Sequence, residues 1–184
     1  TTFASPPRQD RVVPRANYTV LRVKRDILAN SAVGAIFTNR QGGAGADYNR
    51  SVGLDLGLYH GSATKLTALI AKTFSPGVSG MDMAGALDFS WKNDRFDFGT
   101  TYLDIGKRFN AEMGFVPRRD IRNARASAAW TPRPGWRGVR QLTIGGGVDY
   151  YENHSGFMES RNQSGSFQIE CQDSCTLDVG GGYD

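Results

Sequence analysis

The chain has 184 residues, of which 39% are hydrophobic and 22% charged, and its 22 Lys and Arg against 18 Asp and Glu give a net charge of +4. This balance excludes a disordered tail. The longest apolar runs, 31–37 and 66–71, exclude a membrane-spanning helix, which needs roughly 20 residues. The basic residues are scattered and form no stripe, so we expect no nucleic-acid partner.

Residues 1–16 lack the apolar stretch of a signal peptide, and we expect an extended loop or linker there. From residue 17 onward, apolar and small or polar residues alternate, which is the pattern of β-strands with two chemically different faces. Val52 and Leu54, for example, share one face, and Ser51 and Asp55 share the other. The 23 glycines lie within these stretches as well as between them, so the excess of glycine belongs to the architecture.

The alternation predicts about ten strands, each close to the roughly 9–11 residues of a tilted membrane-spanning strand. In chain order they lie near 17–26, 31–40, 51–59, 64–74, 82–92, 96–103, 122–131, 141–150, 163–171 and 175–183. Connections alternate between short ones and longer ones, the long ones being 41–46, 75–81, 106–120 and 152–162. In an up-and-down meander every second turn lies on the same rim, and one rim of short turns and one of long loops is typical of outer-membrane barrels.

One face of the predicted strands is rich in Leu, Val, Phe and aromatic residues, and the other in Gly, Ser, Thr and Ala with isolated Asp. A solvent-facing sheet would carry longer charged side chains, whereas small polar residues suit the interior of a barrel. Two aromatic girdles are expected, with Tyr59, Trp91 and Trp130 at the short-turn ends and Tyr18, Tyr102 and Tyr150 at the long-loop ends. We therefore predict an all-β antiparallel meander that forms a curved sheet or a partial or closed transmembrane-type β-barrel. A soluble ligand-binding β-barrel is one alternative.

The first and the last predicted strand both have their free ends on the long-loop rim. Complete bacterial barrels keep both termini on the periplasmic side. We therefore expect 17–184 to be an internal segment of a larger barrel, truncated at both ends.

Five charged residues are predicted to face the barrel lumen. They would either line a solute path or form paired charges that stabilise a plugged interior. These residues are Asp55, Asp88, Asp97, Arg125 and Asp149.

Five further residues are candidate outer-loop contacts for a glycan or a partner protein, the alternative being a loop that folds over the barrel mouth. They are Phe109, Phe115, Arg118, Arg119 and His154. His154 also lies among polar residues that invite a hydrolase interpretation, but catalysis needs a positioned acid, base and nucleophile and not their co-occurrence in a loop. We predict a non-enzyme and keep an outer-membrane hydrolase as the alternative.

Cys171 and Cys175 flank a three-residue turn with the same strand parity. Opposed across a hairpin, they could form a disulfide in an oxidising compartment, or they are two free thiols. The sequence offers no His or Cys cluster with the spacing of a metal site, and we predict neither a metal nor a cofactor.

Several strings resemble an uncharacterised outer-membrane β-barrel domain of Gram-negative bacteria. The resemblance covers most of 19–170 and is most specific in KRDILANS and GFVPR, with VLRVKRDILANSAVGAIFTNRQ, DYNRSVGLDLGL, AKTFSPGVSG and FNAEMGFVPRRDIRNARASAAWTPRP as the longer strings. In that family the barrel follows a family-nine-type carbohydrate-binding module. The resemblance implies an outer-membrane location, contact with the lipid bilayer and a link to glycans, and it supplies no catalytic residues. We thus predict a non-catalytic barrel segment of a carbohydrate-associated surface or transport protein.

Overall fold

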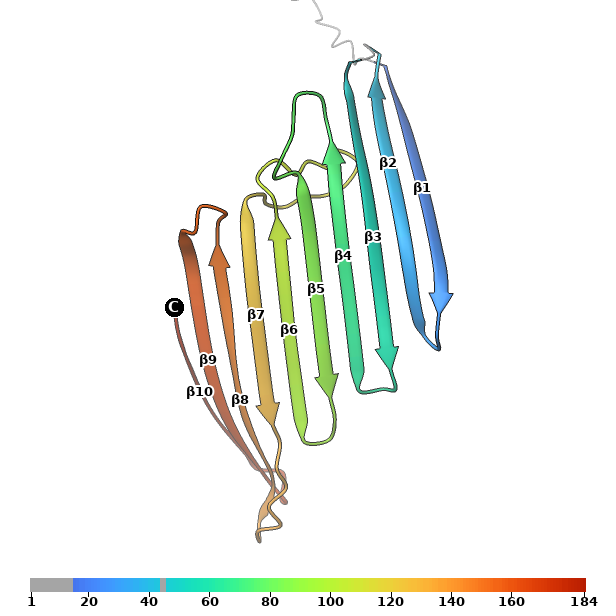
Figure 1. Ribbon diagram of the computed structural model, residues 1–184. Helices are drawn as coiled ribbons and strands as arrows, with labels where there is room; N and C mark the ends of the chain where they lie inside the picture. The colour runs from blue at the N-terminus through green and yellow to red at the C-terminus, as the bar shows by residue number, and fades with distance from the viewer. Residues whose placement is uncertain (1–14, 44–45) are drawn as a thin grey trace, which may run out of the picture.

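The computed structural model describes residues 15–43 and 46–184, and all of its regular structure is β (Figure 1). Ten antiparallel strands form one sheet in the order of the sequence, from β1 to β10, and the sheet is not closed. The predicted meander is therefore confirmed, in the form of an open sheet. Of the predicted linker 1–16, residues 1–14 lie outside the described residues, and Ala16 already belongs to the first strand.

The strands agree closely with the alternating segments of the sequence. Their bounds are β1 Ala16–Ile27, β2 Ser31–Gly42, β3 Tyr48–His60, β4 Thr64–Phe74, β5 Met83–Lys92, β6 Phe96–Ile105, β7 Ile121–Trp130, β8 Val139–Glu152, β9 Met158–Cys171 and β10 Thr176–Tyr183. Consecutive strands pair along most of their length, and the β8–β9 ladder contains two register shifts. The inner strands, β2 to β9, thus pair their backbone groups with neighbours on both sides, whereas β1 and β10 are edge strands that pair on one side.

The prediction of a long loop at 152–162 is wrong. β8 continues to Glu152 and β9 begins at Met158, so 153–157 alone connect them. The side-chain carbonyl of Asn153 accepts hydrogen bonds from the backbone N–H groups of Ser155 and Phe157 and closes a tight turn. The polar residues at 159–162 indicated a loop, but they pair with β8, since Ser160 lies opposite Tyr151 and Asn162 opposite Asp149.

The registers divide the sheet into two faces. One, which we call the apolar face, carries Val52 and Leu54 on β3 and the residues in register with them, among them Ile70, Leu87, Tyr102 and Val148. The other, which we call the polar face, carries Ser51 and Asp55 and the residues in register with them, among them Thr67, Asp88, Thr101, Arg125 and Asp149. Alternation therefore predicted the faces correctly.

The aromatic residues lie near the expected strand ends, but they do not all share one face. Near the short turns, Phe96 on the apolar face stacks between Trp91 and Trp130, with ring centroids 6.3 Å and 6.5 Å apart. Tyr102 and Tyr150 lie on the same face nearer the other rim. Tyr18 and Tyr59, in contrast, have the parity of the polar face, because Tyr18 lies opposite Arg40 and Tyr59 opposite Lys65.

Burial is concentrated in one place. Among the described residues the buried hydrophobic side chains are Ile105, Phe109 and Ile121, and they pack together where the 106–120 loop lies on the polar face. Large apolar side chains of the apolar face remain exposed, including Leu54 at 54%, Ile70 at 48% and Phe96 at 45%. The sheet itself leaves this face uncovered.

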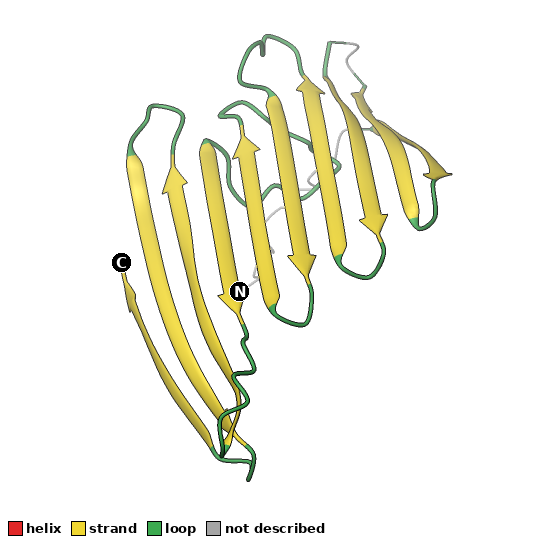
Figure 2. Ribbon diagram, turned by 60° about the horizontal axis from the view of Figure 1, so that its bottom comes forward, coloured by secondary structure: helices red, strands yellow, loops and turns green. Residues whose placement is uncertain are grey.

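The C-terminal strands differ in composition from the rest of the sheet. Three short segments lie in register on β8, β9 and β10 and form what we call the glycine band: Gly145–Gly147, 164–166 and Gly180–Gly182. Figure 1 shows β10 behind β8 and β9, and Figure 2 shows these strands curving away from the flatter part of the sheet. Small residues on both faces permit this curvature, since few side chains crowd the concave side.

Candidate functional site

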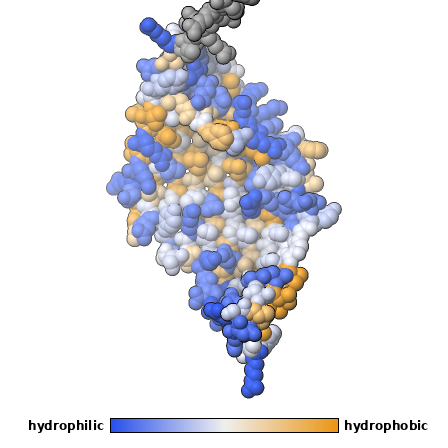
Figure 3. Space-filling model, turned by 180° about the vertical axis from the view of Figure 1, so that it is seen from behind, coloured by the Kyte–Doolittle hydropathy of each residue, from blue (hydrophilic) through white to orange (hydrophobic). Residues whose placement is uncertain are grey.

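The five residues predicted to face a lumen all lie on the polar face, and each has an oppositely charged partner there. Asp55 pairs with Arg22, Asp97 with Lys92 at 2.7 Å, Arg125 with Asp149, and Asp88 lies 4.0 Å from Lys65. Two arrangements were expected for these residues, a solute path or paired charges, and the structure has paired charges. The space-filling view of this side shows mostly hydrophilic and pale residues, with hydrophobic ones mainly in its upper part (Figure 3).

A glycine makes room for one of these pairs. Arg22 on β1 and Asp55 on β3 meet across β2 at Gly34. A Cβ atom added there would lie 2.7 Å from the guanidinium and from both carboxylate oxygens. The glycine on the polar face therefore has a specific role, which is to let a charge pair span the strand between its partners.

The 106–120 loop leaves β6, crosses the polar face over β5 and β4, and reaches β2 before it returns to β7 (Figure 1). At its start, Gly106 N donates to Met83 O at 2.9 Å and Arg108 N donates to Met81 O at 2.8 Å. A Cβ atom at Gly106 would lie 2.3 Å from Met81 O, so this position accepts only glycine without a shift. The loop therefore folds back onto the polar face of the open sheet and does not project from its rim.

Asn49 anchors the loop to β3. Its side chain is fully buried. The amide nitrogen donates to Asn110 O at 2.7 Å and to Ser75 Oγ at 2.9 Å, and the amide oxygen accepts from Glu112 N at 3.2 Å. One side chain therefore holds two backbone groups of the loop, and Thr73 on β4 holds a third by accepting from Asn110 N at 3.2 Å.

The far end of the loop is fixed by charge. Glu112 forms an ion pair with Arg40 on β2, and Arg40 also binds Asp47 at 2.6 Å. The hydrogen bond from Arg40 holds the pKa of Asp47 below its ordinary value of 3.8. The loop is thus attached to β2, β3 and β4 as well as to the strands that it connects.

The loop residues predicted as outer contacts have different surroundings. Phe109 is 7% exposed in the core beneath the loop, so its predicted role as an outer contact is wrong. Phe115, in contrast, is 90% exposed. Arg118 pairs with Glu159 on β9, and Arg119 is exposed. Phe115 is therefore almost fully exposed, and Arg118, at 52%, and Arg119 are exposed as well.

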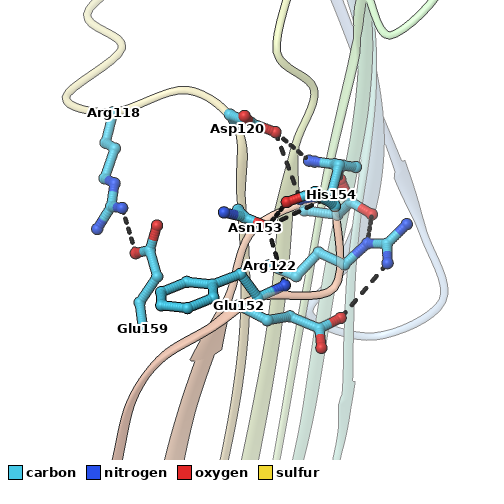
Figure 4. A network of polar contacts seen from close by, with 10 residues as sticks. Arg118, Asp120, Arg122, Glu152, Asn153, His154 and Glu159 are labelled. Carbon is cyan, nitrogen blue, oxygen red and sulfur yellow. Dashed lines mark hydrogen bonds and ion pairs between the residues drawn. The ribbon is translucent and has the colours of Figure 1, made fainter.

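His154 lies in a cluster at the long-loop rim (Figure 4). Its Nδ1 is 3.0 Å from Asp120 and its Nε2 is 2.8 Å from Asp104, and the side chain is 9% exposed. Asp104 also contacts Arg122, which in turn contacts Glu152, both at 3.4 Å. Both ring nitrogens are occupied by carboxylates, so His154 ties the β8–β9 turn to the end of the 106–120 loop.

The polar residues that invited a hydrolase interpretation do not converge on His154. Asp149 lies on the polar face with Arg125, Glu159 pairs with Arg118, and the Ser155 hydroxyl bonds to Asn153. General-base catalysis needs a free ring nitrogen within reach of a nucleophile. The described residues around His154 supply a positioned histidine without such a nucleophile in contact with it.

Cys171 and Cys175 have free thiols in this structure, at the two ends of the β9–β10 turn. Cys171 N donates to Cys175 O at 2.8 Å, so a backbone hydrogen bond already closes the turn. The disulfide stays a prediction, and the turn does not depend on it.

Two of the hollows on the polar face lie over β1 to β6. A groove of about 690 Å³ runs over β1 to β6 and is lined by Lys24, Asp55, Tyr59, Asp88 and Thr101 among others. A smaller pocket of about 240 Å³ lies beneath the 106–120 loop and has an almost entirely apolar lining. Leu69 and Ala86 line both, so the two hollows adjoin.

Comparison of the chain with known protein families, with curated proteins and with solved structures found no match. Within 15–43 and 46–184, no group of His, Cys, Asp and Glu side chains has the arrangement of a metal site. The same residues contain no helix long and apolar enough to cross a membrane.

Proposed function

We propose that this chain forms part of the wall of a non-catalytic β-barrel in a bacterial outer membrane, with the apolar face toward lipid and the polar face toward the interior. The observation that carries the proposal is the division of chemistry between the two faces. The apolar face leaves Leu54, Ile70 and Leu87 exposed along adjacent strands. On the polar face, the five charged residues predicted to face the interior have oppositely charged partners. Exposed apolar surface of this extent marks an interaction site, and lipid would cover it.

The stacked rings of Trp91, Phe96 and Trp130 support this assignment. They lie on the apolar face at the ends of neighbouring strands, which is where aromatic girdles meet the membrane interface. The 106–120 loop supports it from the other side, because a loop that folds onto the polar face and is held there narrows an interior and leaves the lipid-facing surface clear.

A role in solute transport or in surface display would fit this placement. A groove lined by carboxylates, hydroxyls and one tyrosine offers polar contacts to a solute, and the loop restricts the space above it. The link to carbohydrate rests on the family resemblance of the sequence alone, and a glycan would be bound through an upstream module. Sedimentation of the natural protein with insoluble polysaccharide tests that link, and the absence of co-sedimentation would remove it.

The membrane assignment is tested on the natural gene product in cells. We expect it in the outer-membrane fraction, soluble only in detergent, and with a gel mobility that changes on heating, as folded barrels show. A preparation that stays monomeric and folded in plain buffer would overturn the assignment and favour a soluble ligand-binding barrel.

The hydrolase alternative keeps one specific observation in its favour, the pair of carboxylates on His154. A His154→Ala variant separates the two functions. We expect any hydrolysis by the purified protein to be unchanged, because both ring nitrogens are engaged in holding the rim together. A large loss of hydrolysis in a variant that still folds would show that the protein is an enzyme.

A further inference from the structure

The pocket beneath the 106–120 loop is apolar although it lies on the polar face. Leu69, Leu103 and Ile105 line its floor from the sheet, and Val116 lines it from the loop. Its volume is about 240 Å³, and an apolar cavity of roughly 150 Å³ holds a benzene ring. The pocket therefore has room for one ring-sized group.

Small side chains leave this space unfilled. Ala71, Ala84 and Ala86 from the sheet and Ala111 from the loop all border the pocket. Phe115 also borders it, yet 90% of the Phe115 side chain is exposed. An apolar ligand group in the pocket would cover both the pocket lining and the exposed ring of Phe115. Removing this apolar surface from water is favourable.

The pocket opens toward a carboxylate. Ala86 borders both the pocket and the groove, and Asp88 follows two residues later on the same face of β5, roughly 7 Å along the strand. The Asp88 side chain is 44% exposed. Thr101 donates to one of its oxygens at 3.1 Å, and Lys65 is 4.0 Å from the other.

Asp88 is the least tightly paired of the predicted lumen carboxylates. Asp97, for comparison, is 2.7 Å from Lys92, and Asp149 receives hydrogen bonds from both Arg125 and Asn123. A carboxylate whose cation is 4.0 Å away can accept a second cation, since 44% of the Asp88 side chain is exposed.

We propose that the pocket and Asp88 together bind a small amphiphilic cation, with a ring-sized apolar group beneath the 106–120 loop and an ammonium group at the carboxylate. The site goes beyond the proposed function, and it exists whether or not the polar face lines a membrane passage. Binding to the purified protein and location in the cell are therefore separate measurements, and either one can fail without the other.

The test uses the natural protein, purified in detergent, and three probes that share a phenyl ring: 2-phenylethylamine, 2-phenylethanol and phenylacetate. Affinities come from titration calorimetry, with saturation-transfer NMR to identify the bound ring and protein-free micelles as the blank. We expect the amine to bind about five-fold more tightly than the alcohol, because one solvent-exposed ion pair contributes an affinity gain of about that size. Phenylacetate should bind most weakly.

Two variants separate the two parts of the site. Ala84→Leu fills the pocket and should abolish binding of all three probes, with Ala129→Leu, on the same face outside the pocket, as the matched control. Asp88→Asn should make the amine and the alcohol bind equally, whereas Asp97→Asn should preserve the five-fold preference. Should Ala84→Leu fail to fold, Ala111→Leu fills the pocket from the loop side.

Equal affinity of the wild-type protein for the amine and the alcohol would overturn the role of Asp88. Binding by both pocket-filling variants at the wild-type level would overturn the site as a whole.

Discussion

The polar face has two regions. Both belong to the same ladder of backbone hydrogen bonds, but they differ in the loop and the side chains that cover the strands. Over β3 to β6 the 106–120 loop covers the sheet, and the buried residues Ile105, Phe109 and Ile121 lie between them. Over β8 to β10 the glycine band offers few side chains beyond Cβ, and β10 is exposed throughout. The first region has a small core of its own, whereas the second depends on its strand hydrogen bonds and on whatever surrounds the sheet.

The difference between the two regions indicates where a sheet of this kind gains local stability. Backbone pairing is common to both regions, so a difference in protection of their amide groups measures the contribution of the loop. Hydrogen exchange read by mass spectrometry on the folded natural protein resolves the two regions as separate peptides. A substitution in one region should change amide protection there and leave the other region as an internal reference.

The largest effect is expected for Phe109→Ala. The substitution removes the ring from the core beneath the loop, and we expect the local stability of the loop-covered region to fall by about 3 kcal/mol. The matched control is Phe115→Ala in the same loop, where the ring is 90% exposed and the change should stay within about 0.5 kcal/mol. Equal effects of the two variants would contradict the placement of the loop.

Gly106→Ala is expected to come next. The added Cβ would lie 2.3 Å from Met81 O, so the loop must shift where it leaves β6, at a cost of about 2 kcal/mol in the loop-covered region. Gly165→Ala in the glycine band is the control, because a Cβ there meets nothing within 4 Å. We expect that variant to keep or slightly raise the protection of β9. Loss of protection at β9 would show that the band is more tightly packed than the structure has it.

Asn49→Ala should lower the local stability of the loop-covered region by less, about 1.5 kcal/mol. It leaves Glu112 N and Asn110 O without the partners that hold them at 3.2 Å and 2.7 Å. Exchange should rise in 109–113 and stay unchanged in β8 to β10. Asn153→Ala, at a half-buried position in another connection on the same rim, is the reference for the loss of a turn-forming side chain.

The smallest effect concerns Asp82, which lies just before β5. The hydrogen bond from Lys72, at 2.8 Å, holds the pKa of Asp82 below its ordinary value of 3.8. A carboxyl with a lowered pKa stabilises the folded state above its ordinary pKa, and this contribution disappears as the pH falls through the folded value. Protection of 75–82 should therefore decrease below about pH 4. Asp82→Asn should abolish that pH dependence, and a wild-type profile in the variant would assign it to another group.

The alternation of residues was enough to predict the strands and their faces. Met83, Leu87, Phe89 and Trp91 show a period of two, which places all four on one face of β5, and the pairing with β4 and β6 confirms that face. Tyr59 was misplaced in a girdle although its own alternation with Asp55 puts it on the polar face. The alternation alone therefore predicts the face of Tyr59 correctly, whereas its position near the end of a strand does not.

The path of the 106–120 loop could not be predicted in the same way. Asn49 and Glu112 are 63 residues apart, and Arg40 and Glu112 are 72 apart. No local pattern distinguishes Asn49 from other asparagines near strand ends, and Phe109 and Phe115 look alike in sequence. Which ring is buried depends on contacts between β2, β3, β4 and the loop, and these exist only once the sheet has formed. Local periodicity contains no information about them.

We propose that the two faces meet different surroundings, lipid on the apolar face and a polar interior on the polar face. Spin labels at single cysteines along β5, placed at Ala86, Leu87, Asp88 and Phe89 in the natural protein without Cys171 and Cys175, measure this directly in reconstituted bilayers. We predict that accessibility to oxygen, which partitions into lipid, is high at Leu87 and Phe89 and low at Ala86 and Asp88, with the opposite order for a water-soluble nickel chelate. Equal accessibility along the strand, or access of the chelate to Leu87 and Phe89, would contradict it.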